Sequence, residues 1–301
     1  MKRLLMLALL VLALGFAAET MFSKQSPAGI RIEASRAILI DADTGETLYA
    51  KNEQDRAYPA STTKILTALL ALELGNVQEI VTVGREVEPE DPEESRAGLH
   101  EGQRIRLYDL VQAAMLPSGN DAARVIAVHI GRKVSQNPGL GIAEAQNVFA
   151  GLMNERAKSA GARHSHFANP HGLHDPNHYS TAGDLAKIAR EAMRNELFAD
   201  IAHSVRHKAS VAEADGSVTA MTVANRNQLI MPGSENFMKE ATGIKTGFTD
   251  QAGYCLVSSA ERNGRTLIAV VLDSTAQGVY DDTKLLIEYG FNKLKSGFGR
   301  S

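Results

Sequence analysis

The chain has 301 residues, 44% of them hydrophobic and 22% charged, which suffices for one substantial core or for one domain with a large insertion. Its formal net charge is -3 and its Lys and Arg residues are scattered, so we expect no nucleic-acid partner. Cys255 is the only cysteine, which excludes an intramolecular disulfide. Its place on a predicted strand favours a small core residue over a reactive thiol.

The N-terminus begins with two basic residues, continues with an apolar run to Phe16 and then has small residues up to Ala18. This pattern predicts a secretory signal peptide over residues 1–18. An uncleaved membrane anchor is the alternative, although the apolar run is shorter than the ~20 residues that span a bilayer. Either way we expect an exported protein, in the periplasm or on the outer face of the cytoplasmic membrane. Membrane association would then depend on an uncleaved N-terminus.

Residues 37–50 alternate apolar and polar side chains around Asp43, Thr44 and Gly45, which predicts a β-hairpin. Apolar residues at helical spacing predict helices over 61–74, 107–115, 121–131, 143–160 and 181–195. Between the first two of these, the acidic stretch 86–94 carries prolines and like charges, so we expect a solvated loop there. Residues 253–273 repeat the hairpin pattern around Asn263 and Gly264, and residues 280–293 predict a final helix.

This order of elements lacks the strand–helix alternation of a parallel sheet. It fits an antiparallel sheet with helices packed against it and a helical insertion, the α+β class.

Three short motifs combine residues that are able to carry chemistry. The first is AYPASTTKIL, in which Ser61 and Lys64 lie three residues apart at a predicted helix start. They would share one helix face, where the helix dipole and free amides favour developing negative charge. A capping serine followed by a solvated lysine is the alternative interpretation.

The second motif is LPSGNDAA, in which Ser118 and Asn120 lie on a tight connection between two predicted helices. Both short side chains could face a cleft, although Ser-Gly-Asn is also ordinary turn chemistry. The third is TGIKTGFT, where a strand edge could present Lys245 and Thr246 to an anion. Gly247 would let a substrate backbone approach closely. A strand end with an exposed lysine is the alternative.

Taken together in this order, S-x-x-K, S-x-N and K-T-G are typical of the serine penicillin-recognising enzymes. With the stretches NPHGLHDPNHYSTAGDLAKIAR, GIKTGFTDQAGYCLV and LLIEYGF, residues 35–292 closely resemble the D-alanyl-D-alanine carboxypeptidase family, the low-molecular-weight penicillin-binding proteins. The resemblance implies a β-lactamase/transpeptidase-like α/β/α sandwich. Its five-stranded antiparallel sheet would be flanked by helices and carry a mostly helical subdomain.

The resemblance also implies the chemistry, which is acyl transfer from the peptide bond between two D-alanines. Ser61 would be the nucleophile, Lys64 the base and Ser118 a proton relay to the leaving amine. No cofactor is implied. The expected partners are peptidoglycan stem peptides, with β-lactam antibiotics as covalent inhibitors.

Substrate binding would involve six residues, by the same resemblance. Asn120 would hold the amide on the acyl side, and Lys245 and Thr246 would bind the terminal carboxylate. Gly247 would admit the substrate backbone, and the amide of Phe248 would form an oxyanion hole with that of Ser61. Many relatives carry an arginine before the last helix, where this chain has AQGVYDD. Arg226 is therefore a candidate second carboxylate ligand, with a structural surface arginine as the alternative.

The resemblance implies a catalytic domain over residues 30–296. Many relatives continue into a C-terminal β-domain and an amphipathic membrane anchor, and as a departure from that pattern we expect no C-terminal β-domain here. Three other activities remain open. A D,D-endopeptidase would cut the same bond type in cross-links, and a serine β-lactamase would need a glutamate-activated water. Against the latter, no E-x-x-L-N follows Ser118, and the second motif reads Ser-Gly-Asn. A catalytically silent peptidoglycan-binding module is the non-enzyme alternative.

A zinc site is a further alternative, because five histidines crowd one segment: His164, His166, His171, His174 and His178. The segment is rich in turn residues, which would not keep the last two on one helical face.

Overall fold

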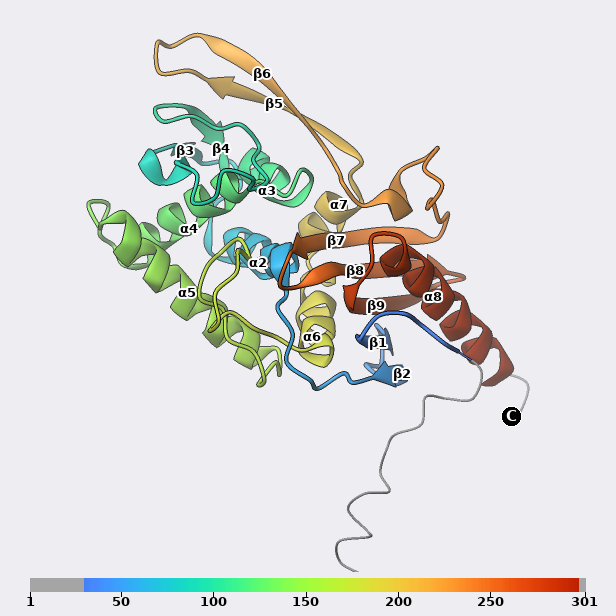
Figure 1. Ribbon diagram of the computed structural model, residues 1–301. Coiled ribbons are helices and arrows are strands. Elements are labelled where there is room, and N and C mark those ends of the chain that lie inside the picture. The colour runs from blue at the N-terminus through green and yellow to red at the C-terminus, as the bar shows by residue number, and fades with distance from the viewer. Residues whose placement is uncertain (1–29, 298–301) are drawn as a thin grey trace, which may run out of the picture. The chain divides into compact units, whose positions relative to one another are not determined.

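The structure is a computed structural model that describes residues 30–297, and residues 32–297 form the body discussed below (Figure 1). Its centre is a five-stranded sheet in the order β2-β1-β9-β8-β7, in which every neighbouring pair is antiparallel. The strands are β1 (Arg36–Asp41), β2 (Thr47–Lys51), β7 (Ala241–Thr249), β8 (Gly253–Arg262) and β9 (Arg265–Ser274). The sheet expected from the sequence resemblance is confirmed.

Both predicted hairpins of this sheet are present. In the β1–β2 turn, Asp41 Oδ1 accepts hydrogen bonds from the amide and hydroxyl of Thr44, and Gly45 has a φ of 80°. In the β8–β9 turn, Asn263 and Gly264 both have positive φ, at 55° and 70°. Two positive φ angles in succession match the right-handed twist of the strands, which explains why Asn-Gly marks this turn.

Both faces of the sheet are covered. Residues 267–272 on β9 are all fully buried, and their side chains alternate between the two faces. On one face lies α8 (Gly278–Gly297), where an added Cβ at Gly290 would come within 2.7 Å of the Leu39 and Leu267 side chains. The opposite face packs against the helices of the main core. The predicted α/β/α layering is therefore confirmed.

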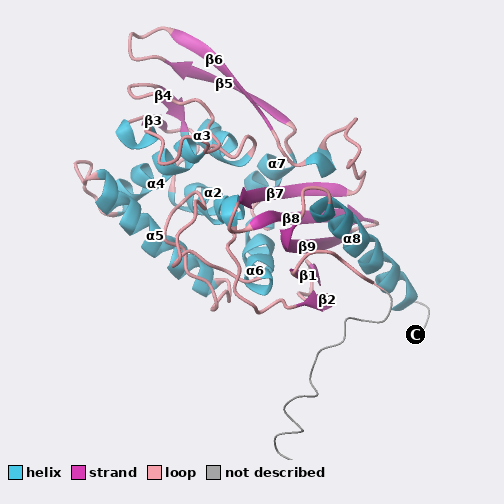
Figure 2. Cartoon of the chain, in the orientation of Figure 1, coloured by secondary structure: helices cyan, strands magenta, loops and turns pink. Residues whose placement is uncertain are grey.

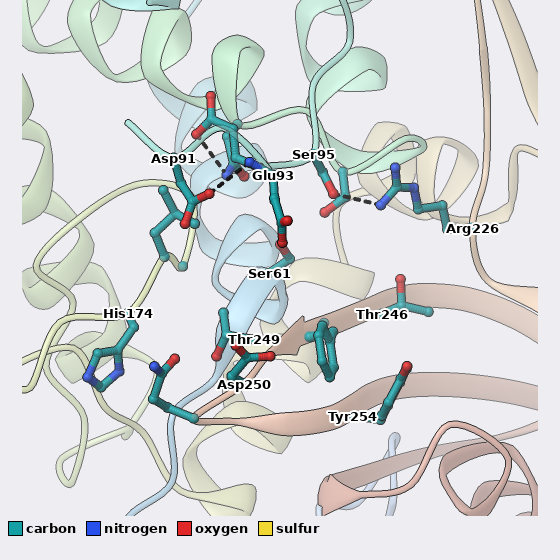
Figure 3. A pocket seen from close by; sticks show the side chains of 18 of the residues that line it. Ser61, Asp91, Glu93, Ser95, His174, Arg226, Thr246, Thr249, Asp250 and Tyr254 are labelled. Atoms are coloured by element: carbon teal, nitrogen blue, oxygen red, sulfur yellow. Dashed lines mark hydrogen bonds between the residues drawn. The ribbon is translucent and has the colours of Figure 1, made fainter. Parts of the chain in front are cut away.

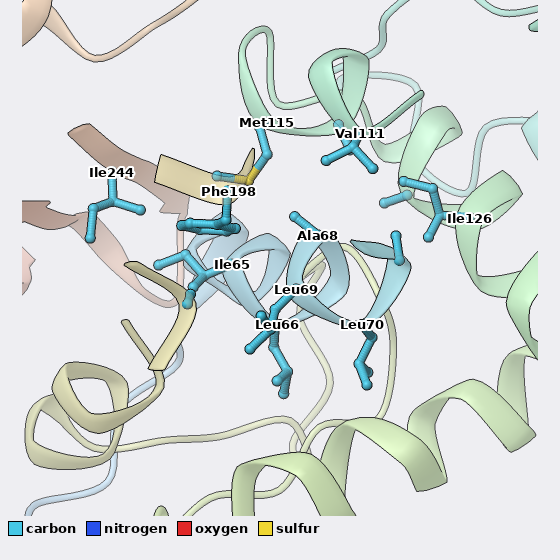
Figure 4. Close-up of a cluster of buried hydrophobic side chains, with 14 of the residues drawn as sticks. Ile65, Leu66, Ala68, Leu69, Leu70, Val111, Met115, Ile126, Phe198 and Ile244 are labelled. Atoms are coloured by element: carbon cyan, nitrogen blue, oxygen red, sulfur yellow. The ribbon is translucent and has the colours of Figure 1, made fainter. Parts of the chain in front are cut away.

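The helical part of the body surrounds one buried helix, α2 (Lys64–Leu74), in which every residue from Lys64 to Ala71 is buried. Figure 4 shows its apolar side chains facing Val111, Ile126, Phe198 and Ile244, which come from three other helices and β7. A helix that is apolar all round needs such complete cover. The surrounding helices are α3 (Leu107–Met115), α4 (Asn120–Val134), α5 (Ile142–Ser159), α6 (Ala182–Met193) and α7 (Glu196–His203).

The chain pattern did not predict α7 or a second sheet, which runs in the order β3-β4-β5-β6 (Figure 2). Its strands are β3 (Ile80–Thr82), β4 (Arg104–Arg106), β5 (Arg206–Ala212) and β6 (Val218–Ala224). Asp215 and Gly216 form the β5–β6 turn, with a φ of 86° at Gly216. This Asp-Gly pair is a hairpin signal that the sequence does carry.

Two expectations need correction. The helix predicted from residue 61 begins as a 3₁₀ turn, η1 (Ala60–Thr63), and becomes α-helical only at Lys64. The stretch 86–94 is not wholly solvated: Glu86 is buried within the short η2 (Arg85–Val87), and the side chain of Glu94 has 0% exposure. Glu94 lies inward because it pairs with Arg124, and one oxygen of Glu86 accepts a hydrogen bond from the Gly84 amide at 3.0 Å. A third 3₁₀ turn, η3 (Gln228–Ile230), precedes β7.

The predicted signal peptide over residues 1–18 lies outside the described residues. Among residues 30–297, no helix combines the length and apolar character needed to cross a membrane. The domain boundaries expected from the sequence stay a prediction.

Candidate active site

A cleft of about 900 Å³ opens between η1, the loop that precedes α4 and the edge strand β7. Its lining includes seven of the residues singled out from the sequence: Ser61, Ser118, Asn120, Arg226, Thr246, Gly247 and Phe248. Figure 3 shows Ser61 at this cleft, with Thr246 on the strand and Arg226 on the far side. The remaining two, Lys64 and Lys245, are buried, with 0% and 2% exposure.

Ser61 and Lys64 face each other because of the local helix geometry. In a 3₁₀ turn, side chains at positions i and i+3 eclipse each other. The η1 turn therefore places Lys64 Nζ 2.9 Å from Ser61 Oγ. The lysine also contacts the Asn120 Oδ1 atom at 2.6 Å and the His171 carbonyl oxygen at 2.7 Å. The Lys64 amine thus contacts three oxygen atoms in the protein interior.

The donors and acceptors around Lys64 determine how a neutral amine is oriented at this position. A neutral amine has two N–H donors and one lone pair, while carbonyl oxygens only accept. The oxygens of Asn120 and His171 therefore take both N–H groups. The lone pair is left facing the Ser61 hydroxyl, which is the arrangement that a general base requires.

The pKa of Lys64 is lowered well below its ordinary value of 10.5, first by burial and then by the positive charge of Lys245. Arg124 lowers this pKa too, whereas the negative charges of Glu94 and Asp121 raise it. Burial and the neighbouring cations prevail, so the site favours the neutral amine.

Ser118 presents a hydroxyl that makes no hydrogen bond within the part of the chain that the structure describes. Its backbone is in the left-handed region, with a φ of 65°, at the turn between α3 and α4. The Oγ atom is buried but has no hydrogen-bond partner among residues 30–297. Since a buried polar atom normally has a partner, this hydroxyl is suited to a ligand in the cleft.

The β7 edge supplies the opposite wall of the cleft. Lys245 Nζ donates to the carbonyl oxygen of Thr246 at 3.0 Å. Burial and the charge of Arg226 lower the pKa of Lys245 from 10.5 to about 7. A Cβ added at Gly247 would lie 3.1 Å from the Ser61 backbone nitrogen, so a larger residue would crowd the close approach of the strand to Ser61.

Arg226 lies in the cleft wall, where its Nη1 donates to Ser95 Oγ at 2.6 Å (Figure 3). Its charge acts on Lys245, which places two cations near each other on one side of the cleft. Arg226 is exposed, as a structural surface arginine would be, but it also lines the cleft, where an anion can reach its guanidinium.

Several residues of the site were missed by sequence reasoning. The carbonyl of His171 carries no side-chain signal, and Gly172, with a φ of 91°, packs so tightly that an added Cβ would collide with the Ala60 carbonyl. Phe248 and Tyr254 form an aromatic pair at the rim, with ring centroids 4.5 Å apart. Glu94 was also missed, because the acidic, proline-rich stretch around it predicted a solvent-exposed loop, whereas its side chain is buried.

The crowded histidines hold loops together. His178 accepts from the Ala168 amide at 3.0 Å through Nδ1, and its Nε2 lies 2.7 Å from Thr63 Oγ1. The ring of His174 packs edge-on against Tyr58. Among residues 30–297, no three His, Cys, Asp or Glu side chains gather in a way that could hold a metal ion.

A buried lysine beside a serine at a helix start, facing a cationic strand edge, defines the class of serine acyl-transfer enzymes. Residues 20–276 match the family model of the D-alanyl-D-alanine carboxypeptidases, and this chain belongs to that family. The resemblance inferred from the sequence motifs is confirmed.

Relatives cover most of the chain. It is 33% identical to the D-alanyl-D-alanine carboxypeptidase DacD of Escherichia coli, over 96% of this chain and 72% of that protein. With DacF of Bacillus subtilis it shares 30% identity, over 98% of this chain and 72% of that one. Among solved structures, the Streptomyces K15 DD-transpeptidase matches with a TM-score of 0.80 and 33% identity, over 88% of this chain and 100% of the other.

Proposed function

We propose that this chain is a serine-type D-Ala-D-Ala carboxypeptidase that removes the terminal D-alanine from peptidoglycan stem pentapeptides. One observation carries the proposal: Lys64 Nζ, buried and held by two carbonyl oxygens, lies 2.9 Å from Ser61 Oγ. The family membership and the relatives' names support the substrate class.

In the proposed acylation step, Lys64 takes the proton of Ser61 while Oγ attacks the carbonyl carbon between the two D-alanines. The backbone amides of Ser61 and Phe248 would stabilise the oxyanion, at about 3 kcal/mol per donor. The C–N bond then breaks as the leaving amine receives a proton through Ser118, whose Oγ lacks a partner within residues 30–297. Water later hydrolyses the ester and frees Ser61.

Substrate binding uses the two sides of the cleft. Lys245, Thr246 and Arg226 would bind the terminal carboxylate, since two cations and a hydroxyl lie on that side. Asn120 would donate its second N–H to the substrate amide, because its first N–H is directed to Glu94 at 3.3 Å. Penicillin, as an acylating analogue of the same peptide, would form a covalent adduct with Ser61. Export to the cell-wall side of the membrane is part of the proposal.

The test uses purified protein, a fluorescent penicillin and two peptide substrates. Wild type should be labelled covalently and should release D-alanine from a pentapeptide faster than it cleaves a cross-linked muropeptide. Ser61→Ala should lose both label and D-alanine release while keeping its melting temperature, because the change removes only a hydroxyl. A stable adduct in Ser61→Ala would overturn the assignment of the nucleophile. Preferential cross-link cleavage would make the protein an endopeptidase.

A further inference from the structure

The Glu94 carboxylate lies near Lys64, the proposed base, and acts on it through its charge. Its side chain has 0% exposure and pairs with the guanidinium of Arg124, which has 2% exposure. The pair is bidentate, with Arg124 Nη1 2.8 Å from Oε2 and Nη2 2.6 Å from Oε1. The same Oε2 atom accepts a hydrogen bond from Asn120 Nδ2 at 3.3 Å. A fixed acceptor therefore lies behind the Asn120 amide.

This carboxylate decides which way the Asn120 amide points. One end of the amide only donates and the other only accepts. With Nδ2 toward Glu94, Oδ1 faces Lys64 Nζ at 2.6 Å. In the flipped orientation, the amide oxygen would face the carboxylate oxygen and the two would repel each other.

The orientation matters for the lone pair of Lys64. With Oδ1 toward it, the neutral amine donates to Asn120 and to the His171 carbonyl, so its lone pair faces Ser61. A flipped amide would instead direct an N–H donor at the lysine and compete with the Ser61 hydroxyl for the lone pair. A correctly oriented amide thus keeps the base available to the nucleophile.

We propose that Glu94 is a positioning residue for acylation, which, held by Arg124, orients the Asn120 amide toward Lys64. The inference rests on the proposed function, since it concerns the same base and nucleophile. Arg124 also donates through Nε to the carbonyl of Glu86 at 2.7 Å, which fixes the guanidinium from a second segment. The carboxylate is therefore anchored to α4, the helix that carries Asn120 at its first position.

A double-mutant cycle tests this role through the rate of acylation by a fluorescent penicillin. Glu94→Ala should slow acylation about 10- to 100-fold, because a small misplacement of a catalytic group costs that much. If Glu94 acts through Asn120, the double variant Glu94→Ala/Asn120→Ala should be no slower than Asn120→Ala alone, within about threefold. Losses that multiply would overturn the proposal. Should Glu94→Ala fail to fold, Glu94→Leu, which is close in volume but has no acceptor oxygen, takes its place in the same cycle.

The pH profile supplies a readout that a merely structural role would not move. Within the described residues, the charged or titratable groups that interact with Lys64 are Lys245, Glu94, Asp121, Arg124 and the rings of His171 and His178. Glu94 raises the pKa of Lys64, so Glu94→Gln should lower it and move the acidic limb of acylation to lower pH. An unchanged or upward-shifted limb would count against the proposal.

Glu88→Gln is the matched control, because Glu88 is an exposed carboxylate on the same loop that pairs with Arg85 and does not line the cleft. It should retain the wild-type rate and pH profile. A wild type that penicillin does not label would defeat the proposed function, and the positioning role would fall with it. If wild type is labelled and the losses multiply, only the role of Glu94 fails.

Discussion

The two buried lysines of the cleft have nearly the same exposure but very different surroundings. Lys64 Nζ contacts three oxygens, from Ser61, Asn120 and the His171 backbone. Lys245 Nζ, within the described residues, makes one hydrogen bond, to the carbonyl of Thr246. An ammonium has three N–H donors, so Lys245 keeps donors for a substrate anion. The contrast supports the two roles proposed above, with Lys64 as the base and Lys245 as the anion ligand.

The pKa of each of the two lysines is lowered by a neighbouring positive charge. Arg226 lowers the pKa of Lys245, and Lys245 lowers the pKa of Lys64. Both lysines are also buried, which acts in the same direction. The cation that we propose as the carboxylate ligand therefore also lowers the pKa of the proposed base, and this double role separates the predictions below.

The largest effect should come from removing the base. Lys64→Met should slow penicillin acylation about 10³-fold, since general-base catalysis contributes about 10²- to 10⁴-fold. Lys64→Arg, which keeps a cation but cannot deprotonate, should be equally impaired. Stopped-flow or gel-based acylation rates measure both. A Lys64→Arg variant near the wild-type rate would mean that Lys64 contributes charge alone.

A smaller loss should follow Lys245→Gln, because a charged hydrogen bond of about 1.5–3 kcal/mol corresponds to roughly 10- to 140-fold in rate. Without the neighbouring cation the pKa of Lys64 rises, so the acidic limb should move to higher pH. An unmoved acidic limb would leave Lys245 as a carboxylate ligand only.

Lys245→Arg is the variant that tests the basic limb of the pH profile, where activity falls as pH rises. The pKa of Lys245 is about 7, so wild type should lose carboxylate affinity as pH rises through that value. Arginine stays charged at every such pH, and this loss should disappear in the Arg variant. Acylation rates over a pH series would show both limbs, and persistence of the basic limb in Lys245→Arg would exclude Lys245 as its source.

The smallest effect should come from Arg226→Gln. Arg226 is exposed and therefore screened by solvent, so we expect a rise in KM of at most about fivefold with little change in kcat. Lys245 loses a neighbouring cation, so its pKa should rise and the basic limb should move to higher pH. Arg226→Lys, which keeps the charge, should preserve the limb. Steady-state kinetics on a pentapeptide give both values, and a large fall in kcat would place Arg226 in the chemical step.

Local sequence patterns predicted much of the fold. Asn263-Gly264 marked its hairpin because the turn needs two positive φ angles, which these residues tolerate. The helix over Leu107–Met115 was predicted with its observed bounds. The second sheet was missed although Asp215-Gly216 carries a turn signal, because each of its strands buries only one or two residues and two of the strands have three residues each.

Eight of the nine candidate residues lie in the three motifs, and Arg226 was proposed because the family's arginine before the last helix is absent. The structure brings all nine to one cleft or next to it. Their individual roles stay predictions. What the motifs could not reveal is the environment: the burial of Glu94, its pairing with Arg124 and the backbone carbonyl of His171. These features depend on contacts between segments that are far apart in the chain. Every residue has a backbone carbonyl, so the residue type does not indicate which carbonyl takes part in the site.

The three contacts of Lys64 also determine when during folding the site becomes reactive. Ser61 is three residues away, but Asn120 is 56 residues away and His171 is 107. In an unfolded chain the lysine would be hydrated, with a pKa near its unperturbed value of about 10.4, and so protonated at neutral pH. The local helix turn alone would bring serine and lysine together without producing a base. Covalent labelling by penicillin would therefore report the fraction of molecules that have completed the long-range fold.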